Sequence, residues 1–548
     1  MQLVPRLISL LTVVAALVNL ASALGVRLSS SWVWVEELYP LGAPVGQSRL
    51  LAAGSSFLLL QLALGLARRK RLAWGLSILL LAASSLHQQW ALGHGREAAL
   101  CGLIALLLVL AGPMFLASSD RPSVRGGVVV LLAALLFTVV YGVLGQIWLE
   151  HRAGRPFELT GAVLQTVSLF LEDTPAIAGL PPGRAARELA TSINALGWLT
   201  GSYALVQLLR PVVQRSTPSP RERARVAELV HAEGVLPLAP LALLGGKSYL
   251  LSACGTAALA YGQSGRGAIV LGGPIGSRQA APALIGSFRE LCRRQDWAPA
   301  FYQVRPDQLA LFRSLGLRSL QIGEDAVVDL RCFSLAGAAG KRLRPALNKF
   351  QRLGYHVELL QSPEAAAMVQ LLKPVQTDWL GRMGGREKRF SVGFFCEQAF
   401  AGAWVGLLRN AVGHVEAFVS LQVNNSAAEV SLDMMRSRSL LPSGAMDALF
   451  IGVMVELQHL GLLSFNLGLC ALKGWMKPAH HPREVSMLLT LAQFLDRRYG
   501  LQGLQAFKQK FSPQWEPRYL VYGSRSDFPD VIRALMRLET RGCGMGAL

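Results

Sequence analysis

The chain contains 548 residues, which is too long for a single domain and is typical of about three. Only 16% of the residues are charged, and the apolar residues are concentrated in the N-terminal part, which argues against a wholly soluble protein and indicates a membrane protein. The net charge of +20 divides unevenly, because residues 1–209 carry 14 basic and 9 acidic side chains whereas residues 210–548 carry 40 and 25. A soluble part this basic is expected to bind a polyanion such as anionic lipid or RNA, although positive-inside bias and solubility would also produce a basic excess.

Six stretches of the N-terminal part are each close to the ~20 apolar residues that a bilayer requires. They are approximately residues 3–24, 50–67, 72–92, 98–117, 127–149 and 191–209. The first lacks a clear cleavage site and is followed by further spans, so we interpret it as an anchor and not as a signal peptide. Placing the basic run Arg68–Arg71 and the pair Arg121 and Arg125 in the cytoplasm puts everything from Arg210 onward there too. The apolar run Gly161–Leu171 is too short to span and is expected to lie at the interface or to re-enter.

After a polar, proline-containing linker, short strands alternate with helices. The predicted strands are residues 249–252, 257–261, 268–271, 301–304, 319–322 and 326–329, and the predicted helices are residues 280–295, 306–315 and 341–352. A second block repeats this order, with strands at 390–395, in a hairpin over 415–434 and at 464–469, and helices at 445–460, 485–498 and 501–510. Two consecutive α/β blocks of similar size predict a duplicated domain.

The hairpin contains a stretch, Glu429–Arg436, in which apolar and polar residues alternate as they do in a strand with one wet face. Asn424-Asn425-Ser426 is predicted to form the turn before it. We therefore expect Asp433 where the strand ends and Arg436 just beyond it, on a more mobile connection. From these residues alone, a solvated surface ion pair and a functional pair both remain open.

Cysteine and histidine usage argues against a disulfide framework and against a metal site. The seven cysteines are far apart and form no Cys-x-x-Cys motif, which suits a reducing cytosol. His480 and His481 adjoin each other in a loop flanked by prolines, without a cysteine or carboxylate at ligand spacing.

Two elements resemble signatures of the aminoacyl-phosphatidylglycerol synthases, the multiple peptide resistance family. They are residues 507–520, FKQKFSPQWEPRYL, and the element Ser431-x-Asp433-x-Met435-Arg436. Further matches follow the family's order across about residues 240–523, at Ile322–Ala326, Phe333–Leu335, Lys341–Arg344 with Asn348, Phe390–Gly393, Met446-Asp447 and Asn466–Gly468.

Three departures from the family pattern are visible. Gly272-Gly273-Pro274 stands where the family has Gly-Asp-Pro, and Cys470-Ala-Leu-Lys473 stands where a Leu-Ser is expected. Many members also carry a longer membrane part with a flippase module, so the chain resembles a short form. Export of the lipid product by the same polypeptide is therefore in doubt.

The resemblance implies a multi-pass α-helical membrane domain followed by a cytosolic α/β part with a tandem GNAT-like acyltransferase fold. The expected divisions are a membrane domain at 1–210, a linker at 211–225, GNAT-like domains at 226–340 and 386–525 with a connection at 341–385 between them, and a C-terminal helix and tail at 526–548.

The resemblance also implies a multi-pass enzyme of the bacterial inner membrane with its catalytic domain in the cytoplasm. It would transfer an aminoacyl group, lysyl or alanyl, from aminoacyl-tRNA to the glycerol hydroxyl of phosphatidylglycerol. The product lowers the negative charge of the membrane and gives resistance to cationic antimicrobial peptides. One ester is exchanged for another, so no cofactor and no metal is expected. The protein must position two polyanions, deprotonate a hydroxyl and stabilise an oxyanion.

Asp433, Arg436 and Lys508 are the expected catalytic residues. Asp433 suits a carboxylate that holds the substrate's ammonium or orients the hydroxyl, and Arg436 suits a phosphate clamp with a planar fork. Lys508 and Lys510 are two positions apart on a predicted helix, so they should point about 200° apart, with only one facing the site. Candidate substrate-binding residues are Ser391, Glu387, Ser431, Asp447, Lys510, Arg518 and Tyr519, and candidate contacts with tRNA or lipid phosphate are Arg342, Arg344 and Lys349.

Several of these residues also have a purely structural explanation. Arg518 is equally suited to pair with Glu516, Asp447 to be a helix-terminal charge, and the basic helix around Lys349 to be a solvated face. A coenzyme A acetyltransferase would need a glycine loop that opens a helix, and the only match, Arg541–Gly546, lies almost at the C-terminus.

Two other functions remain open. One is a Fem-type tRNA-dependent aminoacyltransferase acting on a peptidoglycan precursor, against which the six spans and the Trp-Glu-Pro-Arg-Tyr ending argue. The other is a non-catalytic membrane protein that binds lipid or tRNA, which the Gly273 departure leaves open. The transferred amino acid and the oligomeric state are not readable from the sequence.

Overall fold

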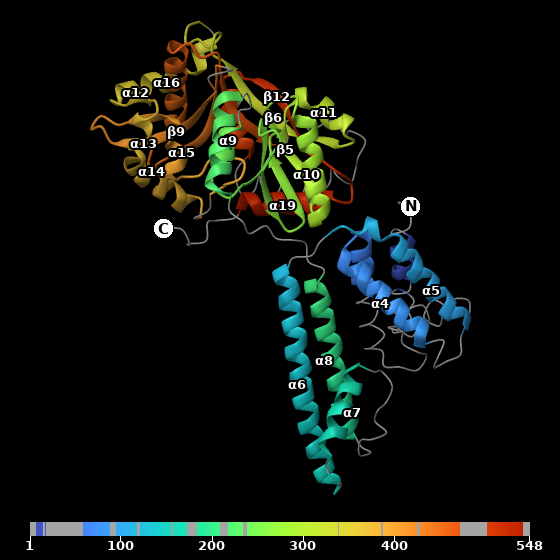
Figure 1. Cartoon of the computed structure of the whole chain (residues 1–548). Coiled ribbons are helices and arrows are strands. Elements are labelled where there is room, and N and C mark those ends of the chain that lie inside the picture. Colours follow the sequence, from blue (N-terminus) through green and yellow to red (C-terminus); the bar gives the residue numbers. More distant parts are fainter. Residues whose placement is uncertain are drawn as a thin grey trace. The chain divides into compact units, whose positions relative to one another are not determined.

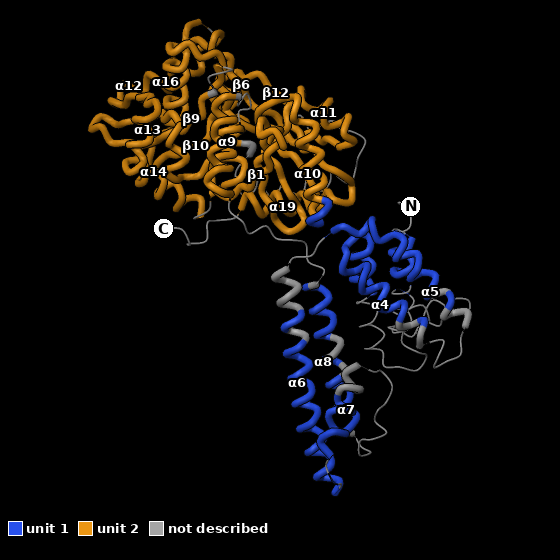
Figure 2. Tube along the Cα trace, in the orientation of Figure 1, with its two compact units in different colours: residues 1–212, 293–296 blue, residues 213–292, 297–548 orange. Residues whose placement is uncertain are grey.

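The computed structural model describes residues 7–14, 17, 59–87, 95–117, 121–154, 156, 158–171, 184–208, 218–233, 238–337, 339–384, 387–424, 428–471 and 501–540. The chain divides into two compact units, residues 1–212 with 293–296 and residues 213–292 with 297–548 (Figure 2). The first unit is helical, and the second is built around one mixed sheet (Figure 1).

Helices α6, α7 and α8 of the first unit pack against one another (Figure 1). A Cβ atom on Gly142 of α6 would lie 2.2 Å from Thr166 of α7, and one on Gly145 would lie 2.6 Å from Leu189 of α8. These two glycines therefore allow the close approach. Helices of this unit include α4 (Arg71–His87), α5 (Gly95–Leu110), α6 (Arg121–Ala153), α7 (Leu159–Leu171) and α8 (Arg184–Leu208), and residues 7–14 and 59–67 are also helical.

Within the residues that the structure describes, one helix is long and apolar enough to cross a membrane, and its qualifying part is Leu132–Ala153. A shorter apolar helix covers Arg71–Ala82. Four predicted spans coincide largely with α4, α5, α6 and α8, whereas the span at 3–24 falls mostly outside the described residues and only the second half of the span at 50–67, residues 59–67, is described and helical. The apolar run Gly161–Leu171 forms most of α7. The passage of these helices through a membrane stays a prediction.

The second unit contains a 12-stranded sheet with the order β1-β2-β3-β5-β12-β6-β11-β10-β9-β8-β7, and β4 pairs with β2. Its strands are β1 (Ser248–Leu251), β2 (Ala257–Ser264), β3 (Gly267–Leu271), β4 (Ile275–Gly276), β5 (Ala298–Val304), β6 (Arg318–Asp329), β7 (His356–Leu360), β8 (Trp404–Arg409), β9 (Val415–Asn424), β10 (Glu429–Ser437), β11 (Ser464–Ala471) and β12 (Gln514–Tyr522). Its helices are α9 (Pro220–Glu233), α10 (Ala281–Gln295), α11 (Leu309–Ser314), α12 (Arg344–Arg352), α13 (Glu364–Ala367), α14 (Val369–Arg382), α15 (Glu397–Phe400), α16 (Ala445–His459), α18 (Leu501–Gln509) and α19 (Phe528–Thr540).

One succession of elements occurs twice in this sheet. Strand β3 leads through α10 to the parallel strand β5, then through α11 to β6, and β10 leads through α16 to the parallel strand β11, then through α18 to β12. The last strand of each succession crosses to the other, because β6 pairs with β11 and β12 pairs with β5. Strands β6 and β12 also pair with each other at the centre. The two halves therefore share one continuous ladder.

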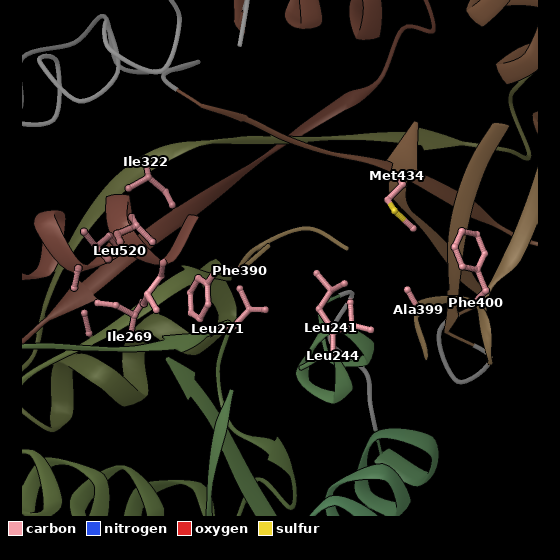
Figure 3. Close-up of a cluster of buried hydrophobic side chains, with 14 of the residues drawn as sticks. Leu241, Leu244, Ile269, Leu271, Ile322, Phe390, Ala399, Phe400, Met434 and Leu520 are labelled. Atoms are coloured by element: carbon pink, nitrogen blue, oxygen red, sulfur yellow. The ribbon is translucent and has the colours of Figure 1, made fainter. Parts of the chain in front are cut away.

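Because the halves interlock, side chains from both enter one buried cluster. Figure 3 shows Ile269 and Leu271 of β3, Leu520 of β12 and Met434 of β10, all of which are buried. Met434 follows Asp433 directly, so this cluster forms one boundary of the region around Asp433.

Most predicted elements of the soluble part are present, with three differences. Strand β6 is continuous where two strands were expected. The predicted strand at Phe390–Phe395 is wrong, because amides of this segment donate to carboxylates and not to a neighbouring strand: Gly393 to Asp433, and Phe395 to Glu387. The predicted helix at 485–498 lies outside the described residues.

Two glycine substitutions should test this packing with opposite signs. A Cβ on Gly267 of β3 would lie 2.2 Å from Ala534 of α19, so Gly267→Ala should lower the free energy of unfolding by about 1–3 kcal/mol. A Cβ on Gly286 of α10 meets nothing within 4 Å, so Gly286→Ala should raise it by about 0.5–1 kcal/mol. Thermal unfolding of the full chain in detergent measures both, and equal effects would contradict the packing.

Candidate functional site

An irregularity in strand β10 positions the centre of the site. Strand β10 pairs in parallel with β11 only over Glu429–Ser431, and its pairing with β9 shifts register between Leu432 and Met434. Asp433 is the residue at this bulge, and bulges redirect side chains. Asp433 thus lies inside the strand and not at its end, which corrects the sequence-based expectation.

The Asp433 carboxylate is bound by the backbone of Gly393 and also interacts with the side chain of Gln422. Its Oδ1 accepts a hydrogen bond from the amide of Gly393. A Cβ on Gly393 would lie 2.1 Å from Oδ2, so only glycine lets the two segments meet this closely. Oδ2 has no hydrogen-bond partner among the described residues. Burial raises the pKa of Asp433, against the lowering effects of the Gly393 amide and the Gln422 side chain.

Arg436 also lies within β10 and is only 7% exposed, so its expected place on a mobile connection is wrong. Its Nη2 lies 2.7 Å from Oε1 of Glu387, its Nε donates to Oε1 of Gln376 at 3.0 Å, and its guanidinium lies 3.7 Å from the centre of the Trp379 ring. Glu387 also accepts from the Phe395 amide at 3.3 Å. The guanidinium of Arg436, which would suit a phosphate group, is therefore already bonded within the protein. Two of its partners, Gln376 and Trp379, lie on α14, which no sequence pattern indicated.

Lys508 lies at a second irregularity, in β11. Its ammonium donates to the carbonyl oxygens of Gly468 at 2.9 Å and Leu469 at 3.2 Å, where the pairing of β11 with β6 shifts register. Lys508 is 2% exposed, and burial lowers its pKa. Lys510 points elsewhere, as expected: it is exposed and binds Asp447 in the first turn of α16 at 2.8 Å.

Arg518 is buried at the centre of the sheet and pairs with two carboxylates. Its Nε donates to Oδ2 of Asp325 at 2.9 Å, and its Nη2 donates to Oε2 of Glu516 at 3.1 Å. Asn466 of β11 donates to the same Asp325 oxygen at 3.1 Å. Tyr519 follows in β12 and packs against an adjacent core cluster.

The remaining candidates are distributed around this centre. Ser391 is buried in the segment that precedes Gly393, and Ser431 is the last residue of β10 paired with β11. Arg344 donates to the carbonyl oxygens of Leu335 and Gly337, Lys349 donates to the carbonyl of Ser443 at 2.9 Å, and Arg342 is exposed at the end of a 3-10 turn. Two of the three basic candidates are thus bonded to backbone.

Sequence reasoning missed two buried charges, Lys247 and Glu539. Lys247 is 4% exposed, and its ammonium lies 5.6 Å from the centre of the Phe390 ring. Burial lowers its pKa to about 8, against the opposing charges of Glu539 and Asp433. Glu539 is 8% exposed and lies in the last turn of α19. Two sequence features could have indicated their burial. Lys247 is an isolated lysine after an apolar run, and Glu539 lies four residues after Leu535, on the apolar face of a helix.

The charged groups that surround Asp433 can exchange protons and bind an ammonium or a hydroxyl. In the part of the chain that the structure describes, no three His, Cys, Asp or Glu side chains converge as metal ligands. The chemistry of this region is therefore that of carboxylates, ammonium groups and backbone amides.

Comparison with known proteins gives a consistent result. Residues 227–522 match the family described as phosphatidylglycerol lysyltransferase, C-terminal. The phosphatidylglycerol lysyltransferases of Bacillus subtilis (strain 168) and Staphylococcus haemolyticus are 30% and 29% identical, over 61% and 63% of this chain. These matches cover only 38% and 40% of those two proteins, so the chain matches about two fifths of their length.

Two solved structures share the fold. The C-terminal domain of a putative lysylphosphatidylglycerol synthetase from Agrobacterium fabrum is 32% identical with a TM-score of 0.53, over 60% of this chain and 99% of that one. L-PGS from Bacillus licheniformis is 30% identical with a TM-score of 0.52, over 59% and 98%. The resemblance seen in the sequence is confirmed, and the chain belongs to the family of phosphatidylglycerol lysyltransferase C-terminal domains.

Proposed function

We propose that this protein transfers an aminoacyl group, lysyl or alanyl, from aminoacyl-tRNA to a glycerol hydroxyl of phosphatidylglycerol. Membership of the family supports the reaction type and favours a lipid acceptor over the peptidoglycan precursor of a Fem-type enzyme. The observation that carries the proposal is the Asp433 carboxylate, in which Gly393 fixes one oxygen, whereas the other makes no well-aligned hydrogen bond in the described part of the chain and has the Gln422 side chain near it. A substrate ammonium or hydroxyl is a suitable donor for it.

The reaction exchanges one ester for another. The glycerol hydroxyl oxygen attacks the ester carbonyl of the charged tRNA, and the resulting tetrahedral oxyanion collapses with loss of the ribose oxygen. The proton of the glycerol hydroxyl ends on that ribose oxygen, so atoms and charge balance without a further reactant. A carboxylate that orients the nucleophile or the donor ammonium contributes by positioning and by proton transfer.

We assign different roles to the three catalytic candidates. Asp433 binds the donor ammonium or the attacking hydroxyl. Arg436 is a positioning residue, because its donors already bind Glu387 and Gln376, and it fixes the strand that carries Asp433. Lys508 fixes the irregular backbone at Gly468 and supplies positive charge toward the oxyanion or phosphate.

The repeated succession of elements supports a tandem GNAT-like fold for the second unit, with halves at about 226–340 and 386–525. The apolar helices of the first unit and a lipid acceptor support a multi-pass protein of the bacterial inner membrane whose second unit faces the cytoplasm. Transfer of a cationic or neutral aminoacyl ester onto the lipid would lower the negative charge of that membrane and give resistance to cationic antimicrobial peptides.

Lipid analysis of a host that lacks aminoacylated phosphatidylglycerol tests the function. Expression of the full chain should produce a new ninhydrin-positive derivative of phosphatidylglycerol on thin-layer chromatography. Its absence together with altered peptidoglycan cross-bridges would instead support the Fem-type reaction. Absence of both changes would support a non-catalytic lipid- or tRNA-binding protein.

Asp433→Asn should lower kcat/KM by about a hundredfold or more, because the amide cannot accept a proton or balance an ammonium. The assay uses charged tRNA and phosphatidylglycerol with the full chain in detergent. Asp378→Asn is the matched control, because that carboxylate binds Ser439 at the surface and its loss should change the rate less than twofold or so. Near-wild-type turnover of Asp433→Asn would remove Asp433 from the site.

The fall of kcat/KM at low pH should reflect protonation of the Asp433 carboxylate. The reaction needs its ionised form, and burial raises its pKa above the ordinary value of 3.8. As the pH falls through this raised pKa the carboxylate takes up a proton, so kcat/KM should begin to fall at a higher pH than an ordinary aspartate would allow. Initial rates corrected for spontaneous ester hydrolysis measure this, and an acid limb at or below pH 3.8 would disagree.

Arg436→Ala should lower the free energy of unfolding by about 3–5 kcal/mol, because it leaves the buried Glu387 carboxylate without its ion-pair partner. Adding Glu387→Gln should restore part of that loss. The control is Arg331→Ala, which removes a surface pair with Asp329 and should change the free energy of unfolding far less. Unfolding in detergent measures all three, and a fully stable Arg436→Ala would contradict the positioning role.

A further inference from the structure

Three exposed aliphatic side chains lie at one end of the second half of the sheet. Leu440 is 97% exposed, Val412 is 80% exposed and Leu353 is about half exposed. Leu353 precedes β7, Val412 lies in the turn between β8 and β9, and Leu440 follows β10. Because these four strands are antiparallel neighbours, the three connections leave the sheet at the same end. We call this group of Leu353, Val412 and Leu440 the apolar end.

The three connections also meet one another. A Cβ on Gly354 would lie 2.8 Å from the Cβ of Ala411, so the segment before β7 touches the turn between β8 and β9. The amide of Arg438 donates to the carbonyl oxygen of Glu416 at 2.9 Å, which joins the segment after β10 to the start of β9. The apolar end therefore lies on adjoining segments, in contrast to single exposed leucines scattered over a surface.

The local structure fixes the exposed side chains in this position. Leu441, directly after Leu440, packs against the core cluster that contains the buried face of α16. In the turn between β8 and β9, Oδ1 of Asn410 accepts a hydrogen bond from the amide of Val412 at 3.0 Å. An aliphatic side chain in water forgoes the free energy that its burial would supply. Ordered connections that present such side chains favour a partner that buries them.

A basic segment, residues 339–355, borders the apolar end. It carries five lysine and arginine side chains and no aspartate or glutamate. Its helix α12 packs against α16 (Figure 1). Among the described residues, Arg344, Lys349 and Arg352 donate to backbone carbonyl oxygens and form no ion pair. The oxygen that Lys349 binds belongs to Ser443, so the basic segment adjoins the loop after β10.

Two carboxylates close to the apolar end already have partners. Glu358 accepts a hydrogen bond from Arg409 at 2.6 Å, and Glu416 accepts one from Asn410 at 2.8 Å. Glu416 also pairs with Arg438 at 3.7 Å. Each of these carboxylates has a cation beside it, so the basic segment gives this region a positive charge. An anionic partner matches that charge.

The surface of an anionic bilayer fits this combination better than RNA does. RNA would match the positive charge, but proteins hold it with basic side chains on phosphates and with aromatic or arginine side chains on bases. The boundary between lipid headgroups and acyl chains buries leucine and valine, and anionic headgroups attract the lysine and arginine beside them. Exposed aliphatic side chains next to a basic helix are therefore typical of a lipid-binding surface.

We propose that the apolar end and the basic segment dock together on an anionic lipid bilayer, with Leu440 and Val412 inserted between the headgroups and the acyl chains. This inference rests on the function proposed above, because it gives the second unit a surface with which to approach its lipid acceptor. Asp433 lies four residues before Ser437, the last residue of β10. At about 3.3 Å per residue, docking brings the end of the strand that carries Asp433 to the bilayer, about 13 Å from that residue.

Photocrosslinking identifies the partner without requiring catalysis. Leu440→benzoylphenylalanine is made in the full chain, which is reconstituted in vesicles of phosphatidylglycerol and phosphatidylcholine with tRNA present. The matched control is Leu460→benzoylphenylalanine, because Leu460 is half-exposed just after the other end of α16. Illumination should give several-fold more phospholipid adduct at position 440 than at position 460. Equal lipid yields, or adducts mainly with tRNA or with a second copy of the chain, would overturn the proposal.

Kinetics in the same vesicles provide a second test. Leu440→Asp should raise the apparent KM for phosphatidylglycerol by about tenfold or more, the factor that corresponds to burying one leucine, with kcat changed less than about twofold. Leu460→Asp should change neither value by more than about twofold. Because Leu440 is almost fully exposed, its substitution should not impair folding. An unchanged KM for Leu440→Asp, or an equal rise for Leu460→Asp, would contradict the docking surface.

The two readouts separate this inference from the function on which it rests. A wild-type chain that forms the phospholipid adducts at position 440 but makes no aminoacylated lipid would refute the function and support the docking surface. A chain that makes the aminoacylated lipid without those adducts would refute the docking surface alone.

Discussion

The separation of two parallel strands is the constraint on which the region around Asp433 depends. Strands β10 and β11 pair with each other over only three residues of each strand and then separate, whereas β10 stays paired with β9 and β11 with β6. Backbone groups that lose a ladder partner inside a protein must find another one. Lys508 supplies donors for the carbonyl groups of Gly468 and Leu469, and Asn466 accepts from the Gly468 amide at 2.8 Å. The side chains expected to do the chemistry are thus also bound to the irregular backbone.

The buried charges fall into two kinds. Arg436 with Glu387 and Arg518 with Asp325 are tight pairs, in which a planar guanidinium makes directional bonds to a carboxylate. Asp433, Lys247 and Glu539 interact by charge without a bond between them. The tight pairs connect the strands that meet at the centre of the sheet to each other and to α14 and the loop after it. These fixed ion pairs hold the backbone that carries the candidate site residues.

Local patterns in the sequence predicted the elements that are made locally. The alternation in Glu429–Arg436 indicated a strand, and the spacing of Lys508 and Lys510 indicated that they point apart. Features that depend on distant segments were not predictable. The segment Phe390–Phe395 reads as a strand, but its amides bind Asp433 and Glu387, which no local pattern reveals. Arg436 was expected on the surface because its partners, on α14 and in the loop after it, lie about fifty residues or more away in sequence. Lys247 and Glu539 converge from opposite ends of the second unit.

The crossing of β6 and β12 has a consequence for how the protein is made. Strand β5 finds its neighbour β12 only after residue 522 has left the ribosome, although β5 itself is synthesised more than two hundred residues earlier. Until then one long side of β5, and one side of β6, present unpaired backbone groups, which are templates for association with other chains. The first half therefore cannot complete its sheet until β12 has been synthesised. A chain truncated just before β12 should therefore expose unpaired edges of β5 and β6 and should not form a smaller stable domain.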